Sequence, residues 1–133
     1  MMLRILILIF SVVVLFLLVC EGGADLAFNR AVEEKDLNSL KVAQVLNPFV
    51  SDYFYEEYRQ THDLAALRRA ISLEPVKPAY HMYYGLALLD LAKRTRLSDE
   101  EAVGEICKAA GLKPYSAQYR ETCIKFRSTI LGQ

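Results

Sequence analysis

The sequence predicts an all-α protein, in which one transmembrane helix precedes a small bundle or short solenoid of helical hairpins. Three observations predict this class: the first twenty residues are almost wholly apolar, later apolar side chains recur at helical spacing, and prolines follow similar segments. At 133 residues the chain has room for one domain beside the membrane segment. We expect the anchor over residues 1–22, a link and the start of the first helix over 23–34, and the helical domain over 35–133.

The membrane segment is the apolar run Leu3–Cys20, which is interrupted by Arg4 and Ser11 alone. A helix of about 18 residues at ~1.5 Å per residue spans ~27 Å, close to the ~30 Å thickness of the hydrocarbon core. The run has no polar face, unlike a helix at the surface of a soluble domain. We therefore expect a transmembrane signal anchor, whose side chains in lipid include Leu3, Phe10, Phe16 and Val19.

Two alternatives to a permanent anchor remain open. Gly22 and Ala24 supply small residues at the −3 and −1 positions before Asp25, as in a cleaved signal peptide. Cys20 would be the acceptor in a lipoprotein, although the bulky Val19 precedes it where such sites have a small residue.

Charge sets the expected orientation and excludes one class of partner. Arg4 and the N-terminal amine precede the apolar run, whereas Glu21 and Asp25 follow it, so we expect the C-terminal domain to be extracytoplasmic, in the periplasm if the cell is bacterial. The 16 basic and 16 acidic residues balance, so we expect no nucleic-acid partner. Nine acids and four bases give residues 21–63 a net charge of −5, and seven acids and eleven bases give residues 64–133 a net charge of +4. Solvated helix faces account for such a dipolar layout, and the alternative is that it steers self-association or docking on a larger complex.

Prolines divide the rest of the chain into helices. Pro48, Pro75 and Pro114 break the helical pattern, and the Gly22-Gly23 pair is expected to form a hinge after the anchor. The expected helices lie near residues 25–46, 51–60, 63–73, 78–95, 99–111 and 116–130.

An internal repeat relates these helices. When Pro48, Pro75 and Pro114 are aligned, at offsets of 27 and 39 residues, each has Ala five residues earlier, Leu two residues earlier and Tyr five residues later. Each unit is thus a helix with an apolar stripe, a proline, and a second helix with an aromatic residue at a fixed height. One unit cannot cover its own apolar face, so the units must stack.

The central unit resembles the tetratricopeptide repeat (TPR) family. The stretch 70–75 (AISLEP) runs into 79–88 (AYHMYYGLAL), and the resemblance covers roughly residues 35–127. The positions that match the family are the Pro that ends a second helix (Pro75), the large-Gly pair (Tyr84-Gly85), the small residue of the next second helix (Ala102), and the closing Ala109 and Pro114. The resemblance implies stacked helix-turn-helix units and a protein-binding role, and it implies no catalysis.

Two stretches, 53–58 and 80–84, are rich in tyrosine. Consecutive aromatic side chains on a helix cannot all face the core. Because tyrosine combines an apolar ring with a polar tip, it is favoured at interfaces. We expect core packing for most of these residues and a partner-binding surface for Tyr55, Tyr58 and Tyr83.

Cys107 and Cys123 lie seven residues before and nine residues after Pro114, where the two arms of an antiparallel hairpin can face each other. An exported domain permits a disulfide between them. The alternative is a pair of buried free thiols that act as small apolar residues.

The sequence lacks the patterns of an enzyme. The histidines His62 and His81 have no Cys or carboxylate at ligand spacing, and no CxxC, HExxH, GxSxG or phosphate-loop motif occurs. We expect packing or capping histidines, no metal, no cofactor and no catalysis. The predicted function is a membrane-anchored interaction or accessory subunit that binds other proteins of a membrane or envelope complex. The alternative is a homo-oligomeric stalk or filament subunit, with the apolar N-terminal helix buried among copies.

Overall fold

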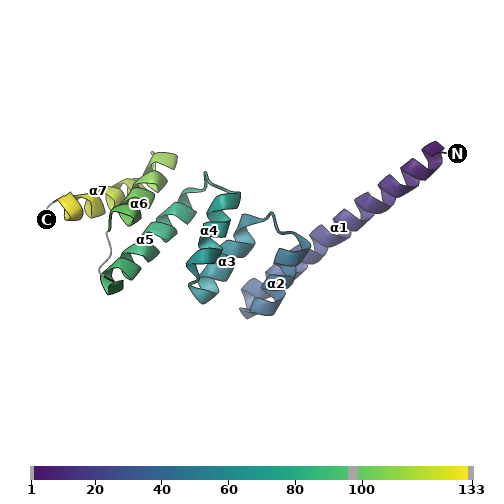
Figure 1. Cartoon of the computed structure of the whole chain (residues 1–133), viewed down its shortest axis with the longest axis horizontal. Helices are drawn as coiled ribbons and strands as arrows, with labels where there is room; N and C mark the ends of the chain where they lie inside the picture. The colour runs from purple at the N-terminus through teal and green to yellow at the C-terminus, as the bar shows by residue number, and fades with distance from the viewer. Residues whose placement is uncertain (1, 96–98, 132–133) are drawn as a thin grey trace.

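The computed structural model describes residues 2–95 and 99–131, and within them it is all-helical, with no strand (Figure 1). The predicted all-α class is therefore confirmed. The helices of the described residues are α1 (Met2–Glu34), α2 (Leu37–Leu46), α3 (Ser51–Thr61), α4 (Leu64–Leu73), α5 (Pro78–Thr95), α6 (Glu100–Leu112) and α7 (Ala117–Leu131). From α3 onward, every bound agrees with the sequence prediction to within one residue.

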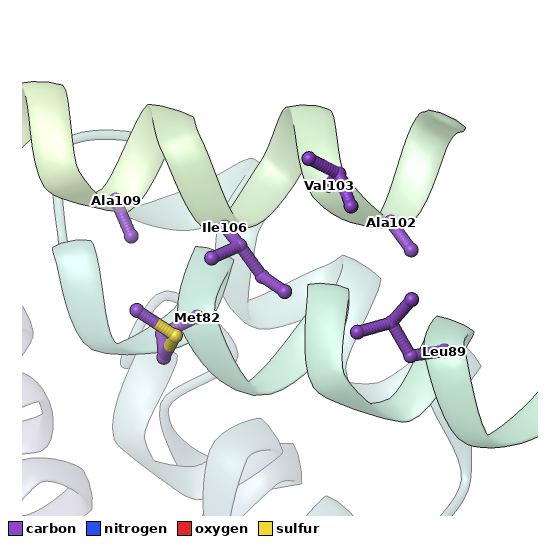
Figure 2. Packing of buried hydrophobic residues seen from close by; sticks show 6 residues of the cluster. All are labelled: Met82, Leu89, Ala102, Val103, Ile106 and Ala109. Atoms are coloured by element: carbon purple, nitrogen blue, oxygen red, sulfur yellow. The ribbon is translucent and has the colours of Figure 1, made fainter. Parts of the chain in front are cut away.

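Neighbouring helices form antiparallel hairpins that stack in chain order, α1 with α2, α3 with α4, and α5 with α6, while α7 packs on α6 (Figure 1). The core is divided among these hairpins. One apolar cluster lies between α1, α2 and α3, a second between α4 and α5 with α3 against it, and a third between α5 and α6 (Figure 2).

The repeat seen in the sequence marks the most deeply buried positions of each hairpin. Six residues at two aligned positions are 0% exposed: Ala43, Ala70 and Ala109, and Leu40, Leu67 and Ile106. The small Ala permits the close approach of the neighbouring helix, and the larger residue one turn earlier fills the space beside it.

Gly85 and Ala102, which the TPR resemblance picks out, meet between α5 and α6. A Cβ atom built on Gly85 would lie 2.6 Å from the Ala102 carbonyl oxygen, which is closer than real Cβ contacts. Glycine is required at this position because the two helix backbones touch there.

The expected hinge at Gly22-Gly23 is wrong, as is the single helix over 25–46. Helix α1 is continuous through both glycines, and the break falls later, at Lys35, whose φ is +54°. Asp36 then caps α2 by accepting hydrogen bonds from the N–H groups of Asn38 and Ser39.

The N-terminal half of α1 projects away from the helical stack (Figure 1). Of the described residues, α1 alone is long and apolar enough to cross a membrane, with a mean hydropathy of 2.9 and none of its most apolar stretch buried. Phe10, Phe16 and Val19 are 65–70% exposed, and the side chain of Leu3 lies outside the described residues. A soluble core helix would be buried, so this half of α1 has the properties of a signal anchor or membrane span.

Candidate protein-binding groove

The tyrosines predicted to bind a partner lie where the second and third hairpins meet. The ring of Tyr55, on α3, is 5.1 Å from that of Tyr80 and 5.5 Å from that of Tyr83, both on α5. Burial is the main cause that raises the pKa of the Tyr55 hydroxyl, and the hydrogen bond with Tyr83 raises it further. Tyr55 is half-buried and joins two hairpins, whereas Tyr83 is 43% exposed.

Beside this aromatic contact lies a groove between α3 and α5, with a volume of about 550 Å³. We call it the α3–α5 groove, and its lining is Tyr58, His62, Leu64, Leu86, Ala87, Asp90 and Leu91. Burial raises the pKa of the Tyr58 hydroxyl, and the nearby Tyr83 raises it further. Four aliphatic and three polar side chains share the lining, so the groove combines apolar and polar surface.

A second groove, of about 340 Å³, lies between α1 and α3 and is lined by Val32, Lys35, Leu37, Glu56, Arg59 and Gln60. Here Arg59 forms an ion pair with Glu56 at 3.0 Å. The two grooves are related by the repeat, because Arg59 stands eleven residues after Pro48 and Leu86 eleven after Pro75. Successive hairpins therefore offer two grooves at equivalent positions, of which the first has three charged side chains in its lining and the second has more aliphatic ones.

A polar network fixes α3 against α5. Tyr80 Oη donates to Asp52 Oδ1 at 2.6 Å, Lys77 Nζ donates to the same oxygen at 2.7 Å, and Ser51 Oγ donates to Glu74 Oε2 at 2.6 Å. Burial opposes the charge of Asp52, but hydrogen bonds from Lys77 and Tyr80 prevail and lower its pKa. Burial would also lower the pKa of Lys77, but its hydrogen bond to Asp52 outweighs this and raises it. The network joins the N-terminal ends of α3 and α5, the two helices that line the α3–α5 groove.

The two histidines have structural positions. His81 is fully buried, with Nδ1 2.5 Å from Glu105 Oε2 and Nε2 2.7 Å from the carbonyl oxygen of Pro75. His62 ends α3 with a φ of +57°, and its N–H donates to the Tyr58 carbonyl at 2.7 Å. Over residues 2–95 and 99–131, no group of three or more His, Cys, Asp or Glu side chains is arranged to hold a metal ion.

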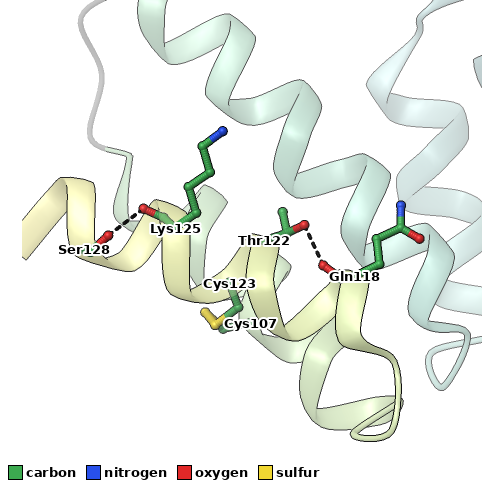
Figure 3. Close-up of a disulfide and its surroundings, with 6 residues drawn as sticks. All are labelled: Cys107, Gln118, Thr122, Cys123, Lys125 and Ser128. Carbon is green, nitrogen blue, oxygen red and sulfur yellow. Dashed lines mark hydrogen bonds between the residues drawn. A yellow bond between two sulfur atoms is a disulfide. The ribbon is translucent and has the colours of Figure 1, made fainter.

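Cys107 of α6 and Cys123 of α7 form a disulfide, with an Sγ–Sγ distance of 2.03 Å and a Cα–Cα distance of 4.8 Å (Figure 3). Both residues pack against the α5–α6 cluster. The bond ties the last helix to the last hairpin.

Of the three tyrosines predicted to bind a partner (Tyr55, Tyr58 and Tyr83), Tyr58 alone lines the α3–α5 groove. The sequence analysis did not single out two other lining residues, Leu86 and Leu91. Their spacing of five residues does not distinguish a groove from a core. The signal that finds them is the repeat, since Leu86 is aligned with the exposed Arg59.

Comparison with known proteins bears on the fold alone. No family model matches the chain, and no curated protein matches it significantly. Among solved structures, it is similar to the type III secretion translocator chaperone SycD of Yersinia enterocolitica, with a TM-score of 0.53 and 17% identity over 86% of this chain and 89% of that one. The fold is of the helical, TPR-like class. At this identity, the likeness shows the arrangement of helices and leaves the function to the residues of this chain.

Proposed function

We propose that this protein is a non-enzymatic, membrane-anchored interaction subunit, which binds another membrane or envelope protein through its TPR-like domain and uses no cofactor. One observation carries the proposal: a single helix, α1, is apolar and exposed over its first half and packed into the first hairpin over its second half. The same helix is thereby both the anchor and the first element of the binding domain.

The proposed topology has the N-terminus in the cytoplasm and the domain outside it. The positive charge that precedes the apolar run and the acids that follow it support this orientation. The Cys107–Cys123 disulfide supports it independently, because such bonds persist in oxidising compartments and are rare in the cytosol.

The α3–α5 groove is the proposed partner site. Its volume suits one or two apolar side chains, and the exposed Tyr83 stands close by. The neighbouring α1–α3 groove, with Lys35, Glu56 and Arg59, would bind a polar stretch of the same segment.

Site-specific photocrosslinking in native membranes tests this function. A photoreactive residue at Tyr83 is expected to capture a different membrane or envelope protein, while one at the exposed Lys108 on α6 captures none. Leu86→Glu should abolish the capture because a carboxylate cannot enter the apolar groove without losing its hydration. The matched control is Ile124→Glu, on the exposed face of α7.

Two outcomes would contradict the proposal. Equal capture from Tyr83 and Lys108 would mean that the groove has no special role. Capture of a second copy of this chain alone would support the self-assembling stalk or filament instead.

A further inference from the structure

Three exposed apolar side chains occupy equivalent places in the three repeats. Each directly follows an aligned proline in the loop that leaves α2, α4 or α6, and they are Phe49 (78% exposed), Val76 (68%) and Tyr115 (97%). An isolated exposed apolar residue is ordinary on a protein surface. Here, however, the repeat preserves one at the tip of every such loop, which indicates a shared surface.

These loops lie at one edge of the stack, which we call the proline-loop edge (residues 47–50, 74–77 and 113–116). Because the hairpins are antiparallel, the loops that leave α2, α4 and α6 all emerge on the same side, and the free half of α1 leaves the stack on that side too (Figure 1).

The register of the first hairpin places this edge near the end of the apolar run. A Cβ atom on Gly23 would lie 3.4 Å from Leu46, the last residue of α2. Gly23 is only three residues beyond Cys20, which is a rise of ~4.5 Å along a helix. The loop that carries Phe49 therefore begins at the height at which α1 emerges from the hydrocarbon.

The opposite edge has a different chemistry. The α1–α2 connection is Lys35-Asp36 and the α3–α4 connection is His62-Asp63, all of them polar. The proline-loop edge instead has apolar tips beside charged residues, namely the exposed Lys113 and the ion pair of Lys77 with Glu74. Aromatic tips and lysines are the residue types enriched at the headgroup layer of a bilayer.

We propose that the proline-loop edge rests on the bilayer that holds α1, with Phe49, Val76 and Tyr115 inserted among the lipid headgroups. The inference rests on the proposed anchoring by α1. A lipid surface fits better than a protein partner, because the tips are single residues on separate loops rather than one continuous apolar patch. Transmembrane helices tilt by about 20° on average from the bilayer normal. The proline-loop edge can therefore lie flat on the bilayer without being perpendicular to the axis of α1.

The sequence contains no tryptophan, so each introduced tryptophan reports from one site. Phe49→Trp, Val76→Trp and Tyr115→Trp are made singly in the full chain. Each is placed at one copy per nanodisc of phosphatidylcholine and phosphatidylglycerol, with plain or brominated acyl chains. Phe10→Trp reports on the anchor, and Glu33→Trp, exposed at the far end of α1, is the matched control.

The expected result is graded quenching by the brominated lipid. Phe10→Trp loses most of its emission and Glu33→Trp none. The three tip variants lose about half, because residues in the interface lie ~5–10 Å into the headgroup and acyl boundary. The tip variants are also expected to emit maximally at shorter wavelengths than Glu33→Trp.

Three results would overturn the inference. If the tip variants are quenched no more than Glu33→Trp while Phe10→Trp is quenched, the anchor stands and the edge does not touch lipid. Quenching at Phe49→Trp alone would reduce the contact to the loop beside α1. If the tip variants show a blue shift without quenching in discs loaded with two copies, and no blue shift in discs with one copy, the tips bind a second copy of the chain. Failure to quench Phe10→Trp would instead overturn the anchoring itself.

Discussion

Substitution of Gly85 by alanine tests the close packing of α5 on α6. The added Cβ would lie 2.6 Å from the Ala102 carbonyl oxygen and from Ile106 Cγ1, and 3.0 Å from the Ile106 amide nitrogen. Ordinary contact begins at 3.4 Å, so the two helices must separate by about 0.8 Å. Two of the three contacts are backbone atoms of α6, which no side-chain rotation can move.

Two effects of opposite sign determine how much Gly85→Ala changes the free energy of unfolding. Overpacking of this kind costs about 1–3 kcal/mol, whereas alanine in place of glycine in a helix gains about 1 kcal/mol. We expect Gly85→Ala to lower the free energy of unfolding by up to about 2 kcal/mol. Gly104→Ala on α6 is the control, because no atom lies within 4 Å of its added Cβ. It should raise the free energy of unfolding by about 1 kcal/mol.

Urea unfolding of the full chain in mild detergent, followed by far-ultraviolet circular dichroism, measures both variants. The helix-propensity gain is common to the two, so the difference between them isolates the contact with α6. If Gly85→Ala unfolds at the same urea concentration as Gly104→Ala, or a higher one, the close-packing argument is refuted.

Three further predictions use the same unfolding measurement. Cys123→Ser should lower stability by about 3 kcal/mol, because it opens a loop of 16 residues, and dithiothreitol should destabilise the wild type but not this variant. Asp52→Asn should lose its pairing with Lys77. Because the folded pKa of Asp52 is lowered, the wild-type advantage over Asp52→Asn is present at neutral pH and should vanish as the pH falls through that pKa, below about 4. His81→Leu should cost about 1–3 kcal/mol, because it removes the buried partner of Glu105, and an unchanged midpoint would contradict this.

The sequence was sufficient for the repeat and for the residues that pack most closely. Where a helix packs closely on its neighbour, the sequence has an alanine at the same position of each repeat. Aligning the three prolines therefore identified Ala43, Ala70 and Ala109, all of them fully buried. The same alignment predicted the ends of α2, α4 and α6 and the starts of α3, α5 and α7, because each lies close to an aligned proline, which interrupts helical hydrogen bonding.

The sequence could not predict which side chains of one helix contact which side chains of another. Glu105 faces His81 across 24 residues of chain, at a distance set by how far α6 is rotated against α5. The lining of the α3–α5 groove depends on rotation in the same way, since Leu86 on α5 and Tyr58 on α3 line one groove only after the hairpins stack. Apolar periodicity predicts which face of a helix is covered, but not which residues of another helix cover it.

With α1 as the proposed anchor, the continuity of this helix makes the anchor part of the proposed binding geometry. Each helical residue advances ~1.5 Å and turns by about 100°, so the residues between Cys20 and the buried Ala24 and Ala31 determine the height and direction of the first hairpin. A flexible glycine link would leave the domain free to turn, whereas α1 runs unbroken through Gly22 and Gly23. In the proposed membrane setting, the same register that brings the end of α2 to the bilayer surface turns the proline-loop edge toward the lipid. A partner must then reach the α3–α5 groove from a direction that this one helix dictates.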